Sequence, residues 1–340
     1  MSNLFKHGHA CIIGVGGDLP NTTTDATALA DVLKDPGRCA YPPEQVQLLT
    51  AAAATRDNIL NALDALATST HDDATVVIYF SGHGHQLSGS VVDTYYLLCS
   101  GYSIQNLKGT GIRGDEFAER LQSIPAKKLL VILDCCHAGG LSDFSDFQVA
   151  KSPLPPEAQK IFSKGDGRII IGSSKADELS YGGKPYSAFT HALLQGFHGE
   201  GVSKKDGYVR ATDLAMYASS IVPQLTKDLQ HPVLDIDKAD NFVLAYYAGG
   251  ELQPKGLPPE LASPPQIEST PGELSGNITQ TTASGAGAVA ISGNANGATI
   301  ITGSNNTAST YNVNQQGKYN INIGSTRDAS RINIGDRAQE

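Results

Sequence analysis

The sequence predicts an α/β fold with a mostly parallel central sheet, followed by a low-complexity, β-prone C-terminal tail. Two apolar runs support this prediction: ATVVIYFSGHGHQ at residues 74–86 and LLVILDCCHAGG at residues 129–140. Unbroken runs of branched residues that end abruptly in small and polar residues are typical of strands buried on both faces of a parallel sheet. The third observation is the alternation of strand-like and helix-like segments, which indicates a sheet covered by helices on both faces.

The expected elements follow one another along the first 248 residues. Residues 22–33 carry apolar side chains at helical spacing, with Asp25 near the N-terminus, where the helix dipole favours an acid. Thr55 is the expected N-cap of the next helix. In chain order we expect a strand at 10–15, a helix at 22–33, a strand at 46–49, a helix from Thr55 through Ile59, Leu60, Leu63 and Leu66, a strand at 76–80, an extended segment at 94–99, a helix marked by Phe117, Leu121 and Ile124, strands at 129–133 and 168–171, helices at 189–197 and 212–222, and a strand at 241–245.

The composition excludes several classes of protein. A formal net charge of -9, without clusters of Lys and Arg, argues against a general nucleic-acid binder. No apolar run approaches the length of a membrane span, and the run near the N-terminus is too short for a signal peptide. The five cysteines show no disulfide framework, so we expect reduced thiols and a cytoplasmic protein.

Cys136 and His83 follow the two apolar runs at the sheet edge where chemistry is expected in parallel sheets. A thiol becomes a nucleophile when a neighbouring base removes its proton, and an imidazole can supply that base. The glycines around both residues permit tight backbone turns, in which N–H groups could hold the oxyanion of an attacked carbonyl. This arrangement indicates acyl-transfer chemistry.

The motifs SGHG at 81–84 and DCCHAG at 134–139 resemble those of the caspase-like cysteine peptidases, within them the metacaspase and orthocaspase branch. NTTTDA, YFSGHGHQ, DTYYLL and YSAFTHALLQGF are similar to that family in order and spacing, over about residues 8–247. The resemblance implies a caspase-like three-layer sandwich and a cysteine endopeptidase. It makes His83 the general base and Cys136 the nucleophile of a thioester mechanism, with the N–H groups of Gly84 and Cys136 as oxyanion donors.

Asp25, Ser81 and Asp134 match the positions of the acidic specificity pocket of metacaspases. The resemblance therefore implies peptide or protein substrates cut after Arg or Lys, because a carboxylate pair can accept bidentate hydrogen bonds from a guanidinium. Without the resemblance, Asp25 could be only an acid at a helix N-terminus, and Asp134 a simple turn residue.

We expect no metal cofactor. Many metacaspases have a calcium-binding cluster of Asp residues after the His strand, whereas this sequence offers Asp93 alone, so calcium dependence is doubtful. A zinc site would need ligands in poor tetrahedral spacing. Its candidate ligands are Cys135, Cys136, His137, His83 and His85. Cys11, Cys39 and Cys99 are expected to be small core residues.

A long loop at 143–167 follows the expected nucleophile. In caspase-like enzymes this region is where the precursor is often cut, so Lys151, Lys160, Lys164 and Arg168 are candidate sites of self-cleavage. Exposed Lys residues are also ordinary in any solvated loop.

The chain is expected to have a peptidase domain at 1–248, a Pro-rich linker at 249–276 and a Gly/Asn-rich repetitive tail at 277–340. Asn-rich strands of low charge are suited to stacking between chains, so the tail is a candidate for self-association; a disordered tail or a small β-solenoid is the alternative. The alternative function is a catalytically weak scaffold that acts through tail-driven assembly.

Overall fold

The structure, a computed structural model, describes residues 4–87, 94–135, 158, 160, 162–175, 178–237 and 239–268, together with six strands between residues 280 and 336. The chain forms two compact units, Met1–Pro271 and Gly272–Glu340. Each unit is described by itself.

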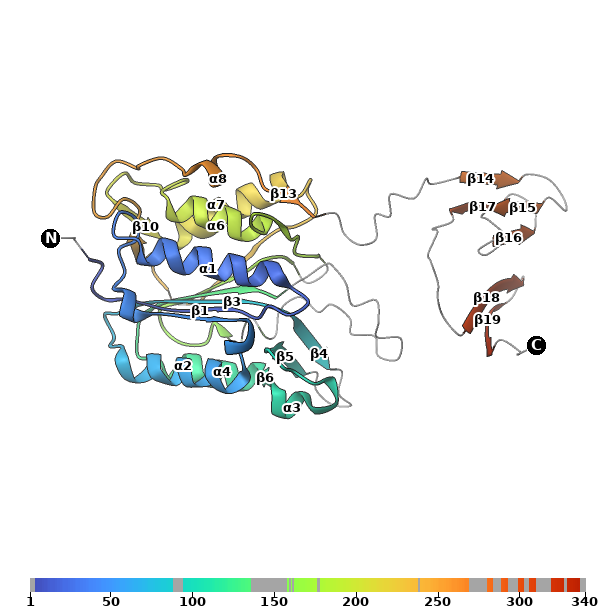
Figure 1. Cartoon of the computed structure of the whole chain (residues 1–340), viewed down its shortest axis with the longest axis horizontal. Helices are drawn as coiled ribbons and strands as arrows, with labels where there is room; N and C mark the ends of the chain where they lie inside the picture. Colours follow the sequence, from blue (N-terminus) through green and yellow to red (C-terminus); the bar gives the residue numbers. More distant parts are fainter. Residues whose placement is uncertain are drawn as a thin grey trace. The chain divides into compact units, whose positions relative to one another are not determined.

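A six-stranded sheet forms the centre of the first unit, with strand order β11-β8-β7-β3-β1-β2 (Figure 1). The neighbours β2, β1, β3, β7 and β8 run parallel, and β11 pairs antiparallel with β8 at one edge. The register places Gly14, Ser81 and Asp134 in one row across β1, β3 and β7. The strands are β1 (Gly8–Gly14), β2 (Val46–Thr50), β3 (Thr75–Ser81), β7 (Lys128–Asp134), β8 (Arg168–Gly172) and β11 (Val233–Asp237).

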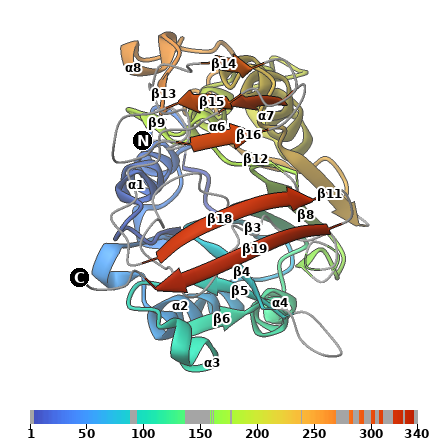
Figure 2. The same cartoon turned by 90° about the vertical axis from the view of Figure 1, so that its right-hand side faces the viewer.

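Helices cover both faces of this sheet, which confirms the predicted three-layer architecture. In Figures 1 and 2, α1 (Pro20–Lys34), α6 (Ala188–Phe197) and α7 (Ala211–Leu225) lie on one face. On the other face lie α2 (Arg56–Ser69) and α4 (Gly114–Ser123). Alternate residues of each strand enter separate hydrophobic clusters, so that in β1 Ile12 packs on the α1 side and Ile13 on the α2 side. This explains why the strands are apolar without alternation.

Smaller elements complete the unit. The segment expected to be extended at 94–99 is β5, which lies in a separate antiparallel sheet of order β4-β5-β6. The remaining elements are β4 (Gly84–Leu87), β5 (Thr94–Leu98), β6 (Gly111–Arg113), β9 (Gly183–Lys184), β10 (Tyr208–Arg210), β12 (Val243–Tyr246), β13 (Gln266–Ile267), α3 (Leu107–Thr110), α8 (Pro259–Ala262) and 3-10 turns at Pro43–Gln45, Ala51–Ala53 and Ile104–Asn106.

Two helix starts test the sequence predictions. Thr55 is the N-cap of α2 and its side chain accepts a hydrogen bond from the N–H of Asn58 at 3.4 Å, as predicted. The expectation that Asp25 lies near the N-terminus of this helix was wrong, because α1 begins at Pro20 and has no acidic residue in its first turn. Asp25 is instead fully buried further along the helix, so the helix-terminus alternative does not apply.

Arg168 was wrongly placed among the exposed candidate cleavage residues. It begins β8, is 5% exposed, and donates from Nη2 to the carbonyl oxygen of Ile124 at 3.2 Å. Burial also lowers the pKa of its guanidinium. Lys160 and Lys164 are exposed, and Lys151 lies outside the described residues.

The segment expected to be a linker packs against the first unit over its described part, residues 249–268. Leu261 in α8 is 2% exposed, and Gln195 donates to its carbonyl oxygen at 2.8 Å. Further on, β13 pairs antiparallel with β9. The boundary between the compact units therefore falls after Pro271 and not after residue 248.

The second unit contains antiparallel strand pairs. They are β14 (Gln280–Ala283) with β17 (Asn306–Ser309), β15 (Val289–Ser292) with β16 (Thr299–Thr302), and β18 (Tyr319–Thr326) with β19 (Ala329–Asp336). The register of the last pair sets Ile321 opposite Ile334 and Asn322 opposite Asn333. The two copies of the INI motif, one in β18 and one in β19, thus pair with each other, and each residue lies opposite a residue of the same type.

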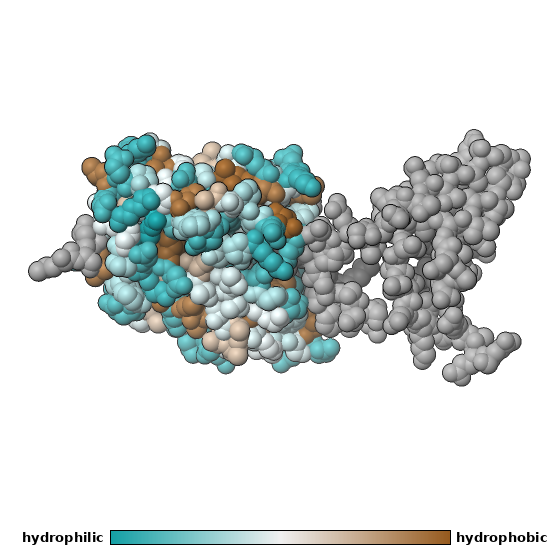
Figure 3. All heavy atoms as spheres, turned by 45° about the horizontal axis from the view of Figure 1, so that its top comes forward, coloured by the Kyte–Doolittle hydropathy of each residue, from teal (hydrophilic) through white to brown (hydrophobic). Residues whose placement is uncertain are grey.

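Apolar and polar residues are interspersed on the face of the first unit shown in Figure 3. The exposed large apolar side chains come from different elements: Leu87, Met216, Leu229, Ile236 and Leu252. Among the described residues no helix combines the length and the apolar character needed to cross a membrane.

Candidate functional site

A buried acidic pair lies at the carboxyl edge of the sheet. Asp134 ends β7 and Ser81 ends β3 in the neighbouring register position, while α1 supplies Asp25. Their exposures are 6%, 2% and 1%. Gly14 permits this arrangement, because a Cβ there would lie 2.2 Å from the carbonyl oxygen of Thr22 in α1. The structure therefore brings the three predicted pocket residues together.

Serine and amide groups hold the two carboxylates. The N–H of Ser187 donates to Oδ1 of Asp25 at 3.1 Å, and the hydroxyl of Ser180 donates to Oδ1 of Asp134 at 2.7 Å. Gln230 fixes this loop, since its Nε2 donates to the hydroxyl of Ser180 at 3.1 Å. Its Oε1 accepts from the N–H of Tyr181 at 2.9 Å. These donors, taken from the described residues, are neutral, so they orient the acids without adding a positive charge.

Burial raises the pKa of both carboxyl groups. The pKa of Asp25 rises to about 8, first because of desolvation and then because of the charge of Asp134. Desolvation likewise raises the pKa of Asp134 to about 6, against the opposing hydrogen bonds from Ser180, Ser173 and Ser187. A buried cation would favour ionisation of both acids. The site is thus suited to a basic side chain.

His83 lies in the turn between β3 and β4, at the same edge of the sheet. Gly82 allows the close approach of β1, because a Cβ there would lie 2.6 Å from Cγ2 of Val15. The carbonyl of His83 accepts from the N–H of Leu98 in β5 at 2.9 Å. Nε2 of the ring lies 2.8 Å from Oδ2 of Asp18 in the loop after β1. His83 is thereby fixed through its backbone and its side chain.

The expected nucleophile, Cys136, lies outside the described residues. Its neighbour Cys135 is buried, and the carbonyl of Cys135 accepts from the N–H of Gly84 at 3.1 Å. Gly84 therefore already uses the N–H that was predicted to hold an oxyanion, and this hydrogen bond would have to open before Gly84 could act.

Sequence reasoning missed the groups that surround the predicted site: Asp18, Ser180, Ser187 and Gln230. For Asp18 there was a partial signal, because it lies in the loop after the first strand and the carboxyl ends of parallel strands share one edge, but the sequence does not show which strand is its neighbour. For the others no local pattern marks the residue, since Gln230 reaches Ser180 across 50 positions of sequence.

The candidate metal ligands do not form one cluster in the described part of the chain. There, the group of side chains close enough to share an ion is His71, Asp72 and Asp73, which are exposed and precede β3. His83, His85 and Cys135 are not in such a group; Cys136, His137 and Asp93 lie outside the described residues. Cys11, Cys39 and Cys99 are fully buried, and desolvation raises the pKa of each thiol.

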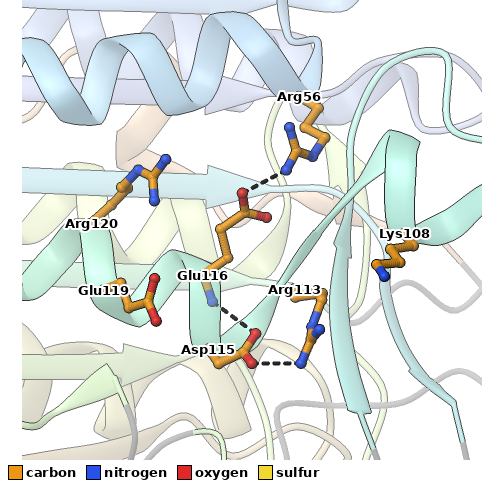
Figure 4. Close-up of a pocket in the computed structure, with 7 residues that line it drawn as sticks. All are labelled: Arg56, Lys108, Arg113, Asp115, Glu116, Glu119 and Arg120. Carbon is orange, nitrogen blue, oxygen red and sulfur yellow. Dashed lines mark hydrogen bonds and ion pairs between the residues drawn. The ribbon is translucent and has the colours of Figure 1, made fainter.

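A charged hollow of about 330 Å³ lies between α2, α3 and α4. Figure 4 shows its acidic and basic side chains facing one another. Arg56 pairs with Glu116 at 2.5 Å and Arg113 with Asp115 at 2.6 Å, so these charges are compensated within the hollow. We therefore assign the chemistry to the sheet edge and not to this hollow.

Comparison with known proteins shows the family to which this chain is similar. The family model described as caspase domain matches residues 7–242. Metacaspase-6 of Arabidopsis thaliana is 24% identical over 226 residues, which cover 63% of this chain and 58% of the relative. Metacaspase-4 of the same plant is 32% identical over 102 residues, covering 29% of this chain and 23% of the relative. Metacaspase-1 of Schizosaccharomyces pombe is 27% identical over 164 residues, covering 42% and 38%. The chain thus spans less than two thirds of the length of these relatives.

Proposed function

Because this chain belongs to the caspase-domain family, we propose that it is a cysteine endopeptidase that cuts substrates after Arg or Lys. The observation that carries the basic preference is the buried pair of Asp25 and Asp134. A guanidinium or ammonium group would bring a positive charge to this pair, whose hydrogen-bond donors among the described residues are neutral. An Asp side chain of a substrate would instead place another carboxylate beside two buried acids.

In the proposed mechanism His83 takes the proton of the Cys136 thiol, and the thiolate attacks the carbonyl carbon of the basic residue. The tetrahedral intermediate then expels the amine, which receives a proton from the imidazolium of His83, and a thioester remains. Water hydrolyses the thioester with His83 again as the base, which releases the acid product and restores the thiol. The N–H groups of Gly84 and Cys136 are the proposed oxyanion donors.

The test is the initial rate on fluorogenic peptides that end in Arg, Lys or Asp, for the wild type and Cys136→Ala, with and without calcium. We expect cleavage after Arg and Lys that the variant abolishes and that calcium does not change. Cleavage after Asp alone would contradict the assignment of the pocket. If the wild type cleaves none of the three peptides, the scaffold function is favoured.

We also propose that the enzyme processes itself in the loop after Cys136. Lys160, which is helical in the structure, and Lys164 are exposed basic residues of this region, while Lys151, earlier in the sequence, lies outside the described residues. Intact masses of the purified wild type and of Cys136→Ala test this proposal. Identical masses would exclude it, and a cut at buried Arg168 is not expected.

The proposed role of the second unit is self-association. Its strand pairs carry few branched apolar residues, and the register of β18 with β19 matches Ile to Ile and Asn to Asn. Identical residue types in register are what stacked strands of separate chains also use. Light scattering on the full chain and on a chain ending at Pro271 tests this role. If both chains have the mass of a monomer at every concentration, the proposed self-association is excluded.

A further inference from the structure

The loop between β1 and α1 presents one carboxylate to the ring of His83. Oδ2 of Asp18 lies 2.8 Å from Nε2 of His83. The side chain of His83 is 9% exposed and that of Asp18 is 41% exposed. This contact joins residues 65 positions apart and involves the residue to which we assign the proton transfer.

The loop that carries Asp18 has a defined shape. Gly16 and Gly17 both have φ of +71°, a conformation that residues with a Cβ rarely adopt. The N–H of Gly16 donates to the hydroxyl of Thr22 at 2.8 Å, and that hydroxyl donates to the carbonyl of Leu19 at 2.8 Å. The side-chain hydroxyl of Thr22 therefore closes the loop from the first turn of α1 and holds the backbone that carries Asp18.

The geometry points to Asp18 as the positioning residue of the general base, an inference that rests on the proposed function. An ionised carboxylate only accepts hydrogen bonds, so the shared hydrogen must be on Nε2 of His83. Nδ1 is then the unprotonated nitrogen that can take the proton of the Cys136 thiol. When it does, the resulting imidazolium faces an anion that is already in place.

Ionisable groups near this pair come from several described elements. Asp18 follows β1 and contacts His83, and its charge acts on Tyr102, which follows β5. His85 lies in β4, and the carbonyl of Cys135, after β7, accepts from the N–H of Gly84 beside His83. Desolvation and then the charge of Asp18 raise the pKa of Tyr102, while desolvation lowers the pKa of His85. Both side chains are therefore neutral near pH 7, whereas Asp18 is a carboxylate in direct contact with His83.

The test compares kcat and KM on an Arg-ending peptide for the wild type, Asp18→Asn, Asp18→Glu and the control Asp64→Asn. Asp64 on α2 is a matched control, because its half-exposed carboxylate pairs with Arg120 of α4 at 3.1 Å. For Asp18→Asn we expect kcat to fall about tenfold to a hundredfold, below the range of about 10²–10⁴ for the acid–base group itself. KM and the melting temperature should stay unchanged, and Asp18→Glu should recover part of kcat.

A second readout needs no substrate. The rate at which iodoacetamide alkylates Cys136, located by peptide mapping, reports the thiolate that His83 generates. It should fall in Asp18→Asn and not in Asp64→Asn. The inference would be overturned if Asp18→Asn kept the kcat and the alkylation rate of the wild type. It would also be overturned if Asp64→Asn lost as much of both rates as Asp18→Asn. If Cys136→Ala still cleaved the peptide, the proposed function would fail instead, and the alkylation rate would still decide the role of Asp18.

Discussion

Ionisable side chains gather at both ends of β3, and the two groups differ in burial more than in residue type. At the amino end, His7 and residues 71–73 are all exposed, with Nδ1 of His7 3.3 Å from Nε2 of His71. At the carboxyl end, His83, Asp25 and Asp134 are between 1% and 7% exposed. Both ends offer imidazoles and carboxylates.

The difference shows how burial converts common residues into a specific site. Water screens the exposed charges, and exposed pairs of this kind contribute about 0–1 kcal/mol. At the carboxyl end, desolvation raises the pKa of Asp25 and of Asp134. A basic ligand at this end would offset the desolvation penalty of ionising the two buried carboxyl groups. We therefore propose that the substrate is recognised at this end.

The largest expected effect comes from removing one acid of the buried pair. Asp134→Asn should lower kcat/KM on an Arg-ending peptide at least about a hundredfold, because breaking a buried ion pair costs about 3–5 kcal/mol. Asp73→Asn, at the amino end of β3, is the matched control and should leave kcat/KM unchanged. Equal losses in the two variants would mean that burial does not distinguish the two ends.

The second prediction concerns pH. Between about pH 6 and 8 the buried pair loses its protons, because these are the raised pKa values of Asp134 and Asp25. A bound Arg favours the ionised acids, so the affinity of Cys136→Ala for an Arg-ending peptide should rise with pH by about tenfold across this range. Calorimetric titrations at several pH values measure this affinity. A flat profile would show that the acids are already ionised below pH 6.

The third prediction is that ionisation of Asp25 destabilises the fold at high pH. Its pKa in the folded chain, about 8, exceeds its ordinary value of 3.8, so the folded state binds the proton more tightly than the unfolded state. Stability is then highest below the unfolded pKa and falls as the pH rises towards 8. At pH 8.5 the raised pKa corresponds to a penalty of about 6 kcal/mol, and each kcal/mol shifts the melting temperature by about 2–4 °C. Asp25→Asn should therefore raise the melting temperature by about 10 °C or more at pH 8.5, and by less at pH 5.5.

The Asp25 control is Asp57→Asn, whose carboxylate is 84% exposed in the first turn of α2. Its melting temperature should follow that of the wild type at both pH values. An Asp25→Asn variant that is equally destabilised at both values would show that packing, and not charge, governs this position.

The sequence was sufficient for the features that depend on local pattern. The apolar runs predicted β3 and β7, and the polar residues that end them placed Ser81, His83 and Asp134 at one edge. The strand β11 was missed because VLDID alternates apolar and acidic residues, as suits an edge strand and not a buried one. The contact of Asp18 with His83 depends on how β1 lies beside β3, which no local pattern encodes.

The smallest expected effect is at the amino end of β3. His71→Ala should change the free energy of unfolding by no more than about 0.5 kcal/mol, because the side chain is exposed. The backbone hydrogen bond from Ala74 to the carbonyl of His71 does not need the imidazole. Denaturant unfolding and kcat/KM on an Arg-ending peptide measure both consequences. A clear loss of kcat/KM at unchanged stability would mean that the two ends of β3 are coupled, and exposure alone would no longer separate a functional cluster from an ordinary one.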